Sequence, residues 1–493
     1  MSRCIGSGFC AYLCFAFAST SLEGQERPNV ILLLADDLGY ADVGAYGHPY
    51  AKTPAIDELA KSGTVFRNYY NAASVCSQSR WGIMTGRFPA TLGVKVWRSG
   101  RPSGNVITIT QLLRQRGYRT GHFGKWHLGD IELHRDDGID EVREIEGDPE
   151  DERGRDACIA DAAIDFIQRN KDSPFYLNVW FRAPHAPVRP PKPLLDRFKD
   201  LQFNVKDFPY DNFLSYCSVY QEKVGSIDHA MRNYLGEISQ LDDQIARVLK
   251  VIDQTGLRDS TIVVFTSDNG PARSRRTRFD YVAEPQSNDY TVGFAGKYRA
   301  GKHSVYEGGI RAPWIMRWPG HIPEGAVDEN SVIAAVDWLP TLGAITGGLK
   351  APRQFDGEDV SDIWRGQRRT RQRSLFWSTD EWYGRVRAVR HGDWKLHQTN
   401  DGLYELYDLK VDPGETNNIA ESNPQTVGKL GGAINDWIKT LPGNDVARVA
   451  TQLNDGDSGL RSSPGKLGIT LRWMSGLVIA LCVLWVIWRR FSR

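Results

Sequence analysis

Three apolar runs stand out in the first part of the chain: NVILLLA at 29–35, PFYLNVWF at 174–181 and STIVVFTS at 260–267. Segments with apolar residues at helical spacing lie between them, such as TPAIDELAKSG at 53–63 and the stretch from Asp228 to Thr255. Strands that are apolar on both faces and alternate with helices are typical of parallel sheets buried under helices on both sides. The pattern predicts an α/β fold with a large, mainly parallel sheet flanked by helices.

The pattern changes after residue 345. A loop-like stretch and the basic turn RGQRRTRQR precede short segments such as RAVRHGDWKLHQ and LYELYDLKVDPGE, which are typical of antiparallel strands. Residues 446–470 are polar and rich in Gly, Ser and Asp, as expected of a linker. We therefore expect a large α/β domain over 27–345, a smaller C-terminal α+β domain over 346–445, and a linker over 446–470.

Both ends of the chain carry apolar segments. Arg3, an apolar stretch and Ala16-Phe17-Ala18 indicate a signal peptide over 1–18, with an uncleaved membrane anchor as the alternative. Residues 471–488 contain an uncharged run bounded by Trp473 and Trp488, followed by arginines, and indicate a transmembrane anchor. A GPI signal is the competing interpretation, and the charged end argues against it. We expect a protein that is exported to the periplasm, the lumen or the outside and is anchored at its C-terminus.

The net charge and the cysteine content exclude some classes of partner and of fold. A formal net charge of +1 over 493 residues argues against general affinity for nucleic acid. Of seven cysteines, four lie in the predicted signal or anchor, and if Cys76 is committed to chemistry, only Cys158 and Cys217 are left to pair. The chain is therefore not a disulfide-built scaffold.

Acidic and amide side chains follow two of the apolar runs directly: Asp36 and Asp37 follow the first, and Asp268 and Asn269 follow the third. Ligand sites in such sheets lie at the carboxyl ends of the strands. An all-oxygen set favours a hard cation, Ca²⁺ or Mg²⁺, over zinc. Taken alone, the Asp pair is equally well explained by solvated turn carboxylates or helix caps.

A lone cysteine precedes a helical segment in NAASVCSQSRWGIMTGR. If the helix begins near Cys76, its N-terminus and Arg80 both favour an anion beside the cysteine. The alternative is an inert, buried cysteine, which is the commoner role of this residue.

Several motifs occur in one order along the chain: NVILLLADDLG, CSQSRWGIMTGRFP, GHFGKWHLG, APHAP, TSDNG, AGKHSVYEGGIRAP and LYDLKVDPGETNNIA. Together they resemble the sulfatases of the alkaline phosphatase superfamily, from about residue 28 to about residue 420. The resemblance implies a sulfuric ester hydrolase in which Cys76 is oxidised to formylglycine by a maturation enzyme. It also implies a sulfate ester substrate, for which we expect a sulfated carbohydrate.

The resemblance also implies roles for individual residues. One divalent ion, Ca²⁺, would be held by Asp36, Asp37, Asp268 and Asn269 together with the modified residue 76. Arg80 and Lys125 would support the hydrated aldehyde, and His127 would act as a base. His185 and Lys302 would engage the sulfate and the leaving group.

One position departs from the family pattern. The family usually has proline or alanine two residues after the cysteine, where this chain has Gln78. If Cys76 stays a thiol, the alternative is a catalytically silent binder of sulfated glycans. A phosphoester hydrolase on the same fold is a third hypothesis, although phosphatases of this superfamily usually use two zinc ions and several histidines, which are few here. The basic segment RSRRTRF at 273–279 is either a guide for a polyanionic substrate or a solvated loop.

Overall fold

The computed structural model describes residues 27–94, 102, 106–133, 135–210, 213–215, 217–218, 221, 226–272, 291–347, 355–379, 386–399 and 401–442. Residues 1–443 form one compact unit, and the remainder of the chain is a second. The predicted signal peptide, linker and membrane anchor and the basic segment 273–279 lie outside the described residues. Within the described ranges, no helix is both long and apolar enough to cross a membrane. Cys158 and Cys217 are not joined by a disulfide.

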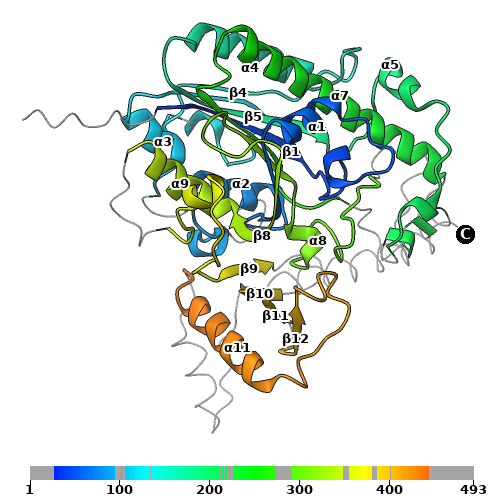
Figure 1. Cartoon of the computed structure of the whole chain (residues 1–493), viewed down its shortest axis with the longest axis vertical. Coiled ribbons are helices and arrows are strands. Elements are labelled where there is room, and N and C mark those ends of the chain that lie inside the picture. The colour runs from blue at the N-terminus through cyan, green and yellow to red at the C-terminus, as the bar shows by residue number, and fades with distance from the viewer. Residues whose placement is uncertain are drawn as a thin grey trace, which may run out of the picture. The chain divides into compact units, whose positions relative to one another are not determined.

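An eight-stranded sheet forms the centre of the first unit (Figure 1). Its strands are, in spatial order, β4 (Glu141–Glu144), β3 (Arg119–Gly124), β5 (Phe175–Pro184), β1 (Asn29–Asp36), β6 (Thr261–Ser267), β7 (Trp314–Arg317), β2 (Thr64–Tyr70) and β8 (Ala326–Ala334). β7 runs antiparallel to both of its neighbours, and the other pairings are parallel. The prediction of a large, mainly parallel sheet is confirmed.

Helices cover both faces of this sheet (Figure 1). One face carries α1 (Pro54–Lys61), α4 (Ala157–Asn170), α5 (Lys192–Leu195) and α7 (Ile227–Gln254), and the other carries α2 (Cys76–Thr85), α3 (Ile109–Gln115) and α9 (Trp338–Ile345). The short helices are α8 (Glu307–Ile310), α10 (Ser361–Trp364) and the 3₁₀ turns Gly44–Tyr46, Pro89–Leu92, Ile131–Leu133, Asp196–Phe198, Val205–Asp207 and Ala335–Asp337.

The burial of both faces of the central strand β1 explains its continuous apolar sequence. Successive side chains of a strand point to opposite faces. Ile31 and Leu33 pack into the core under α4 and α7, whereas Leu32 and Leu34 pack into the core on the α2 side. Because both faces are buried, every position of the strand from Val30 to Ala35 is apolar.

A four-stranded antiparallel sheet forms the C-terminal part of the same unit. It consists of β9 (Leu375–Thr379), β10 (Val386–His391), β11 (Trp394–Gln398) and β12 (Tyr404–Asp408), in the order β12-β11-β10-β9. The helix α11 (Pro424–Lys439) packs on this sheet through a small core that includes Leu396, Leu406 and Ile434. The predicted smaller α+β region is confirmed, with the antiparallel sheet as its β part and α11 as its helix.

Buried charges join the two sheets. Lys395 Nζ on β11 lies 2.8 Å from Glu307 Oε1 at the start of α8 and 2.9 Å from Glu415 Oε1. Arg311 Nε lies 2.5 Å from Glu307 Oε2. Although burial by itself raises the pKa of Glu307, Lys395 and Arg311 hold that pKa well below its usual range. Ionised at neutral pH, Glu307 ties the α8 segment to the smaller sheet.

His48 makes the stability of the fold depend on pH. Its ring is 5% exposed, and Nδ1 accepts hydrogen bonds from the backbone N–H groups of Tyr50 at 3.1 Å and Ala51 at 3.0 Å. Burial lowers the pKa of His48 to about 3. In the unfolded chain the histidine pKa is about 6.5. As the pH falls below that value, the unfolded state binds a proton that the folded state does not bind, which favours unfolding. Stability is therefore lost on acidification.

We expect His48→Asn to flatten this dependence. The free energy of unfolding of the wild type should fall by about 2 kcal/mol more than that of the variant between pH 6.5 and pH 4.5. Urea denaturation at a series of pH values measures this difference. The exposed His391 gives the matched control, because His391→Asn should keep the wild-type slope. Equal slopes for the wild type and His48→Asn would contradict the assignment.

Candidate active site

The ends of four adjacent strands create the site. β3, β5, β1 and β6 lie side by side and parallel, so their carboxyl ends meet at one edge of the sheet. Asp36 pairs in register with Pro184, and Ala35 pairs with Ser267. This alignment brings together residues that follow the four strands, namely Asp37, Lys125, His185 and Asp268.

Three carboxylates and a thiol gather at this edge. Asp36, Asp37, Asp268 and Cys76 each offer one ligand atom, and these atoms all lie within 4.8 Å of one another. All four residues are at most 3% exposed. Asp37 has a φ of 66°, and its backbone N–H donates to Asp268 Oδ1 at 3.2 Å. Asp residues tolerate this left-handed conformation better than most, and here it turns the chain sharply just after β1.

Three cationic side chains face the three carboxylates. Arg80 Nη2 lies 2.8 Å from Asp268 Oδ2, and Lys125 Nζ lies 2.6 Å from Asp36 Oδ2. Lys302 Nζ lies 2.5 and 2.7 Å from the two oxygens of Asp37. The carboxylates need these partners because an unpaired buried charge costs several kcal/mol.

The pKa values follow from burial and from these pairs. Burial opposes ionisation of all three carboxyls. Lys302 nevertheless holds the pKa of Asp37 at about 2, and Lys125 holds the pKa of Asp36 well below its usual range. Burial raises the pKa of Asp268 to about 6 in spite of Arg80. At neutral pH the three carboxylates are ionised.

The donor set fits a hard divalent cation. Asn269 Nδ2 donates to Asp37 Oδ1 and to the carbonyl of Gly270, both at 2.8 Å. Asn269 Oδ1 is buried and has no hydrogen-bond partner among the described residues. An unpartnered amide oxygen beside three carboxylates is the kind of ligand that Ca²⁺ and Mg²⁺ take. The residues predicted as metal ligands are therefore brought together in one place.

Cys76 is the first residue of α2. Its Sγ lies 3.3 Å from Asp36 Oδ1 and 3.1 Å from Lys302 Nζ. Burial, together with the neighbouring Asp268, raises the pKa of the thiol well above its usual value. The unmodified thiol is therefore protonated at neutral pH and is a poor nucleophile, because the thiolate is the reactive form. Gln78, two residues on, is 4% exposed in α2.

The two predicted catalytic histidines also reach this edge. His127 follows Lys125 and has a φ of 54°. Burial, with Lys125 and Arg80 nearby, lowers the pKa of His127 to about 3, so its ring is neutral. His185 lies at the open side of the site, with its side chain 38% exposed and Nε2 3.6 Å from Asp37 Oδ2. Its Nδ1 lies 2.6 Å from the carbonyl of Ala186, which only accepts, so Nδ1 carries a proton.

Residues that no sequence motif marks hold the loop of His185 in place. Arg155 Nη2 donates to the carbonyl of His185 at 2.6 Å, and its Nε lies 3.3 Å from Glu237 Oε2 on α7. Asp156 Oδ2 accepts from the backbone N–H groups of Arg182 at 3.0 Å and Ala183 at 2.9 Å. These contacts span 26 to 82 residues of sequence, so only the folded chain reveals them.

Comparisons with known proteins agree with this geometry. The sulfatase family model matches residues 28–348, and the model described as N-sulphoglucosamine sulphohydrolase, C-terminal, matches residues 297–432. The chain is 31% identical over 472 residues to arylsulfatase A of Homo sapiens, covering 86% of this chain and 88% of that protein. It is 26% identical over 494 residues to N-acetylgalactosamine-6-O-sulfatase of Bacteroides thetaiotaomicron, covering 83% and 92%.

A solved structure shows the same fold. The structure of Ps i-CgsB in complex with k-i-k-neocarrahexaose superposes with a TM-score of 0.70 at 24% identity, covering 87% of this chain and 98% of that chain. The family model spans well over half of the chain, and the arylsulfatase A similarity extends over nearly all of that relative. The chain therefore belongs to the sulfatase family and is a sulfuric ester hydrolase.

Proposed function

We propose that this protein hydrolyses the sulfate esters of a sulfated carbohydrate, with hydrated formylglycine at position 76 as the nucleophile and one Ca²⁺ ion. The observation that carries the proposal is the cluster of Asp36, Asp37, Asp268 and Cys76, whose ligand atoms lie within 4.8 Å of one another. Ligands, nucleophile position and cationic side chains thus share one buried edge of the sheet.

Charge balance at this edge supports a divalent ion bound together with an anionic sulfate ester. Three carboxylates face three cationic side chains, so an added divalent ion leaves the site with excess positive charge. Asp36, Asp37, Asp268 and Asn269 would hold the ion, which would help neutralise the charge on the sulfate group. A sulfate ester carries one negative charge, and Lys125 and Lys302 add two donors for its oxygens.

Position 76 needs two hydroxyls rather than one thiol. A hydrated aldehyde supplies one hydroxyl for attack on sulfur and a second whose deprotonation releases the sulfate. The thiol of Cys76 is buried with a raised pKa, and a serine would lack the second hydroxyl. Neither unmodified side chain can complete the cycle.

The histidines divide the proton transfers. His127 is neutral, so it accepts the proton of the second hydroxyl. His185 protonates the oxygen of the leaving alcohol from Nε2, since its Nδ1 is held by the carbonyl of Ala186. Burial lowers the pKa of His185, and Asp36 and Asp37, the latter 3.6 Å from Nε2, partly offset this effect and favour the doubly protonated ring that the transfer requires. His185 lies on the open side of the site, where a departing alcohol must leave.

Names of relatives support the carbohydrate assignment. N-acetylgalactosamine-6-O-sulfatase and N-sulphoglucosamine sulphohydrolase are both named for sulfated sugars. The proposal further includes export through residues 1–18, a membrane anchor at 471–488 and a maturation enzyme that oxidises Cys76 in spite of Gln78.

Mass spectrometry of the peptide that contains residue 76 tests the modification. We expect a mass that corresponds to an aldehyde or its hydrate in place of the thiol. Paired assays with an aryl sulfate and an aryl phosphate test the substrate class, and we expect turnover of the sulfate. A peptide found only as alkylatable cysteine would overturn the proposal in favour of a sulfated-glycan binder.

Replacing Lys302 should slow the reaction without unfolding the protein. Lys302→Ala removes an ammonium group that contacts Asp37 and lies 3.1 Å from Sγ of Cys76. We expect kcat/KM for an aryl sulfate to fall by roughly 10²- to 10³-fold, as when a preorganised charge is lost. The exposed Lys297 in the same loop is the matched control, and Lys297→Ala should keep nearly full activity. Undiminished turnover by Lys302→Ala would rule out the assigned role.

A further inference from the structure

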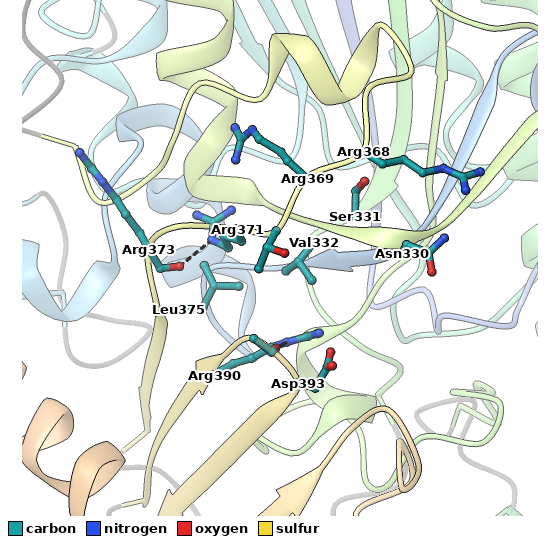
Figure 2. A pocket seen from close by; sticks show the side chains of 12 residues that line it. Asn330, Ser331, Val332, Arg368, Arg369, Arg371, Arg373, Leu375, Arg390 and Asp393 are labelled. Atoms are coloured by element: carbon teal, nitrogen blue, oxygen red, sulfur yellow. Dashed lines mark hydrogen bonds between the residues drawn. The ribbon is translucent and has the colours of Figure 1, made fainter. Parts of the chain in front are cut away.

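A cationic cavity beside β8 and the smaller sheet is lined by none of the candidate active-site residues. Its volume is about 330 Å³, within the range of small-ligand pockets. We call it the arginine pocket, and it is lined by Asn330, Ser331, Val332, Arg368, Arg369, Thr370, Arg371, Arg373, Leu375, Arg390, Gly392 and Asp393. Figure 2 shows arginines of the segment 368–373 and Arg390 of β10 arranged around it, with Ser331 and Asn330 of β8 between them.

Two of the arginines are part of the wall. Arg371 donates to both oxygens of Asp337, at 2.6 and 2.8 Å. Arg369 pairs with Asp362 at 2.6 Å and with Glu358 at 2.9 Å. Their charges are compensated, and their role is to fix the basic segment against the body of the protein.

Two other arginines keep an uncompensated charge. Arg368 is exposed and makes no hydrogen bond or ion pair with any described residue. Arg390 is 6% exposed and donates only to neutral groups, the carbonyl of Gly392 at 3.0 Å and the hydroxyl of Tyr70. Glu307 is close enough to interact electrostatically with Arg390, but its oxygens already pair with Lys395 and Arg311. No carboxylate of the described residues contacts Arg390. A nearly buried guanidinium without a carboxylate favours an anion beside it.

The hydroxyl of Ser331 is a second, independent observation that indicates a ligand in the arginine pocket. Ser331 is 1% exposed, and its Oγ has no hydrogen-bond partner among the described residues. The register between β8 and β2 shifts between Phe66 and Asn68, so β8 bulges at this serine. Buried hydroxyls are normally satisfied, and Ser331 lines the cavity.

The lining suits a sugar better than a free anion. Asp393 also lines the pocket, and its carboxylate can accept hydrogen bonds from sugar hydroxyls, which inorganic sulfate does not offer. Asn330 offers a further donor and acceptor. We propose that the arginine pocket binds a second sulfated sugar unit of the glycan whose ester is cleaved at the strand ends, which rests on the proposed function. Arg368, Arg390 and Ser331 donate to the sulfate group, and Asp393 and Asn330 bind ring hydroxyls.

Kinetics on two substrates distinguish binding in the arginine pocket from the reaction at the strand ends. The test compares kcat/KM of the matured wild type, Arg368→Gln and Arg368→Glu on an aryl sulfate and on a hexasaccharide containing N-acetylgalactosamine-6-sulfate. We expect a loss of about tenfold on the hexasaccharide for Arg368→Gln, a larger loss for Arg368→Glu, both through KM, and no change on the aryl sulfate. The exposed Arg119 at the start of β3 is the matched control, and Arg119→Gln should change neither rate.

The outcomes are distinguishable. Equal kinetics of Arg368→Glu and wild type on the hexasaccharide would overturn the proposal that the arginine pocket binds the glycan. Equal losses of Arg368→Glu on both substrates would overturn it as well. If the wild type turns over neither substrate, the proposed function fails. Calorimetry with the hexasaccharide, its desulfated form and inorganic sulfate then tests binding to the arginine pocket independently of turnover. Binding of the sulfated hexasaccharide that Arg368→Glu weakens supports the pocket, whereas loss of inorganic sulfate binding only would reassign it to a free anion.

Discussion

Cys76→Ser should reduce steady-state turnover of an aryl sulfate by roughly 10⁴-fold or more while leaving the protein folded. A serine that the maturation enzyme leaves unoxidised would give position 76 one hydroxyl where the cycle needs two. The serine oxygen could attack sulfur and expel the alcohol once, but no second hydroxyl on the same carbon would then release the sulfate. Product formation should therefore stop after at most one equivalent per active site.

Stability should change little in this variant, which makes the activity loss interpretable. Cys76 is 3% exposed, and a serine at the first position of α2 fills nearly the same volume and keeps a donor toward Asp36. Rapid-mix and steady-state assays measure the loss, and circular dichroism checks the fold. Cys158, half-buried and remote from the carboxylates, is the matched control, and Cys158→Ser should remain active. Repeated turnover by Cys76→Ser, with mass spectrometry showing an unoxidised serine at position 76, would show that the reaction does not depend on an aldehyde.

Arg80→Met should lower the free energy of unfolding by about 3–5 kcal/mol. Arg80 is fully buried, and its Nε and Nη2 lie 2.9 and 2.8 Å from Asp268 Oδ2. Its Nη1 donates to the carbonyl of Lys125 at 2.9 Å, and its guanidinium lies 4.9 Å from the ring of Trp180. Methionine keeps much of the apolar volume, so the loss reflects mainly a buried carboxylate without its cation.

The same variant links stability to the proposed metal. A divalent ion at Asp36 and Asp268 would replace part of the missing positive charge, so added Ca²⁺ should recover part of the lost stability in Arg80→Met. Urea denaturation with Ca²⁺ and with a chelator measures both effects. Arg169→Met is the control, because this arginine pairs with Glu141 and Asp165 on the surface and should cost less than about 1 kcal/mol. A loss of similar size in both variants would contradict the role of Arg80.

Local sequence pattern was sufficient for most elements. The run from Val30 to Leu34 predicted a strand buried on both faces, and that strand is the centre of the sheet. The helical segment after Cys76 begins at that residue in α2. Such predictions work because burial sets a period of two in strands and of about 3.6 in helices, and both periods are properties of neighbouring residues.

Other features depend on partners that are distant in sequence. β7 is four residues long and runs antiparallel between β6 and β2, and nothing in the sequence WIMR determines its direction. The sequence RGQRRTRQR predicted a basic turn. Only its contacts distinguish Arg371, fixed by Asp337, from Arg368, which has no such partner among the described residues.

The sequence by itself determined which chemistry this protein carries: carboxylates at strand ends, a cysteine at a helix start, and lysines and histidines in motifs that resemble sulfatases. The tertiary structure alone decided that these groups share one site. Asp37 and Asp268 are 231 residues apart, and the parallel pairing of β1 with β6 brings them to a hydrogen bond of 3.2 Å. Residue identity is local, whereas strand order, and with it the pairing of each buried charge, results from packing the whole sheet.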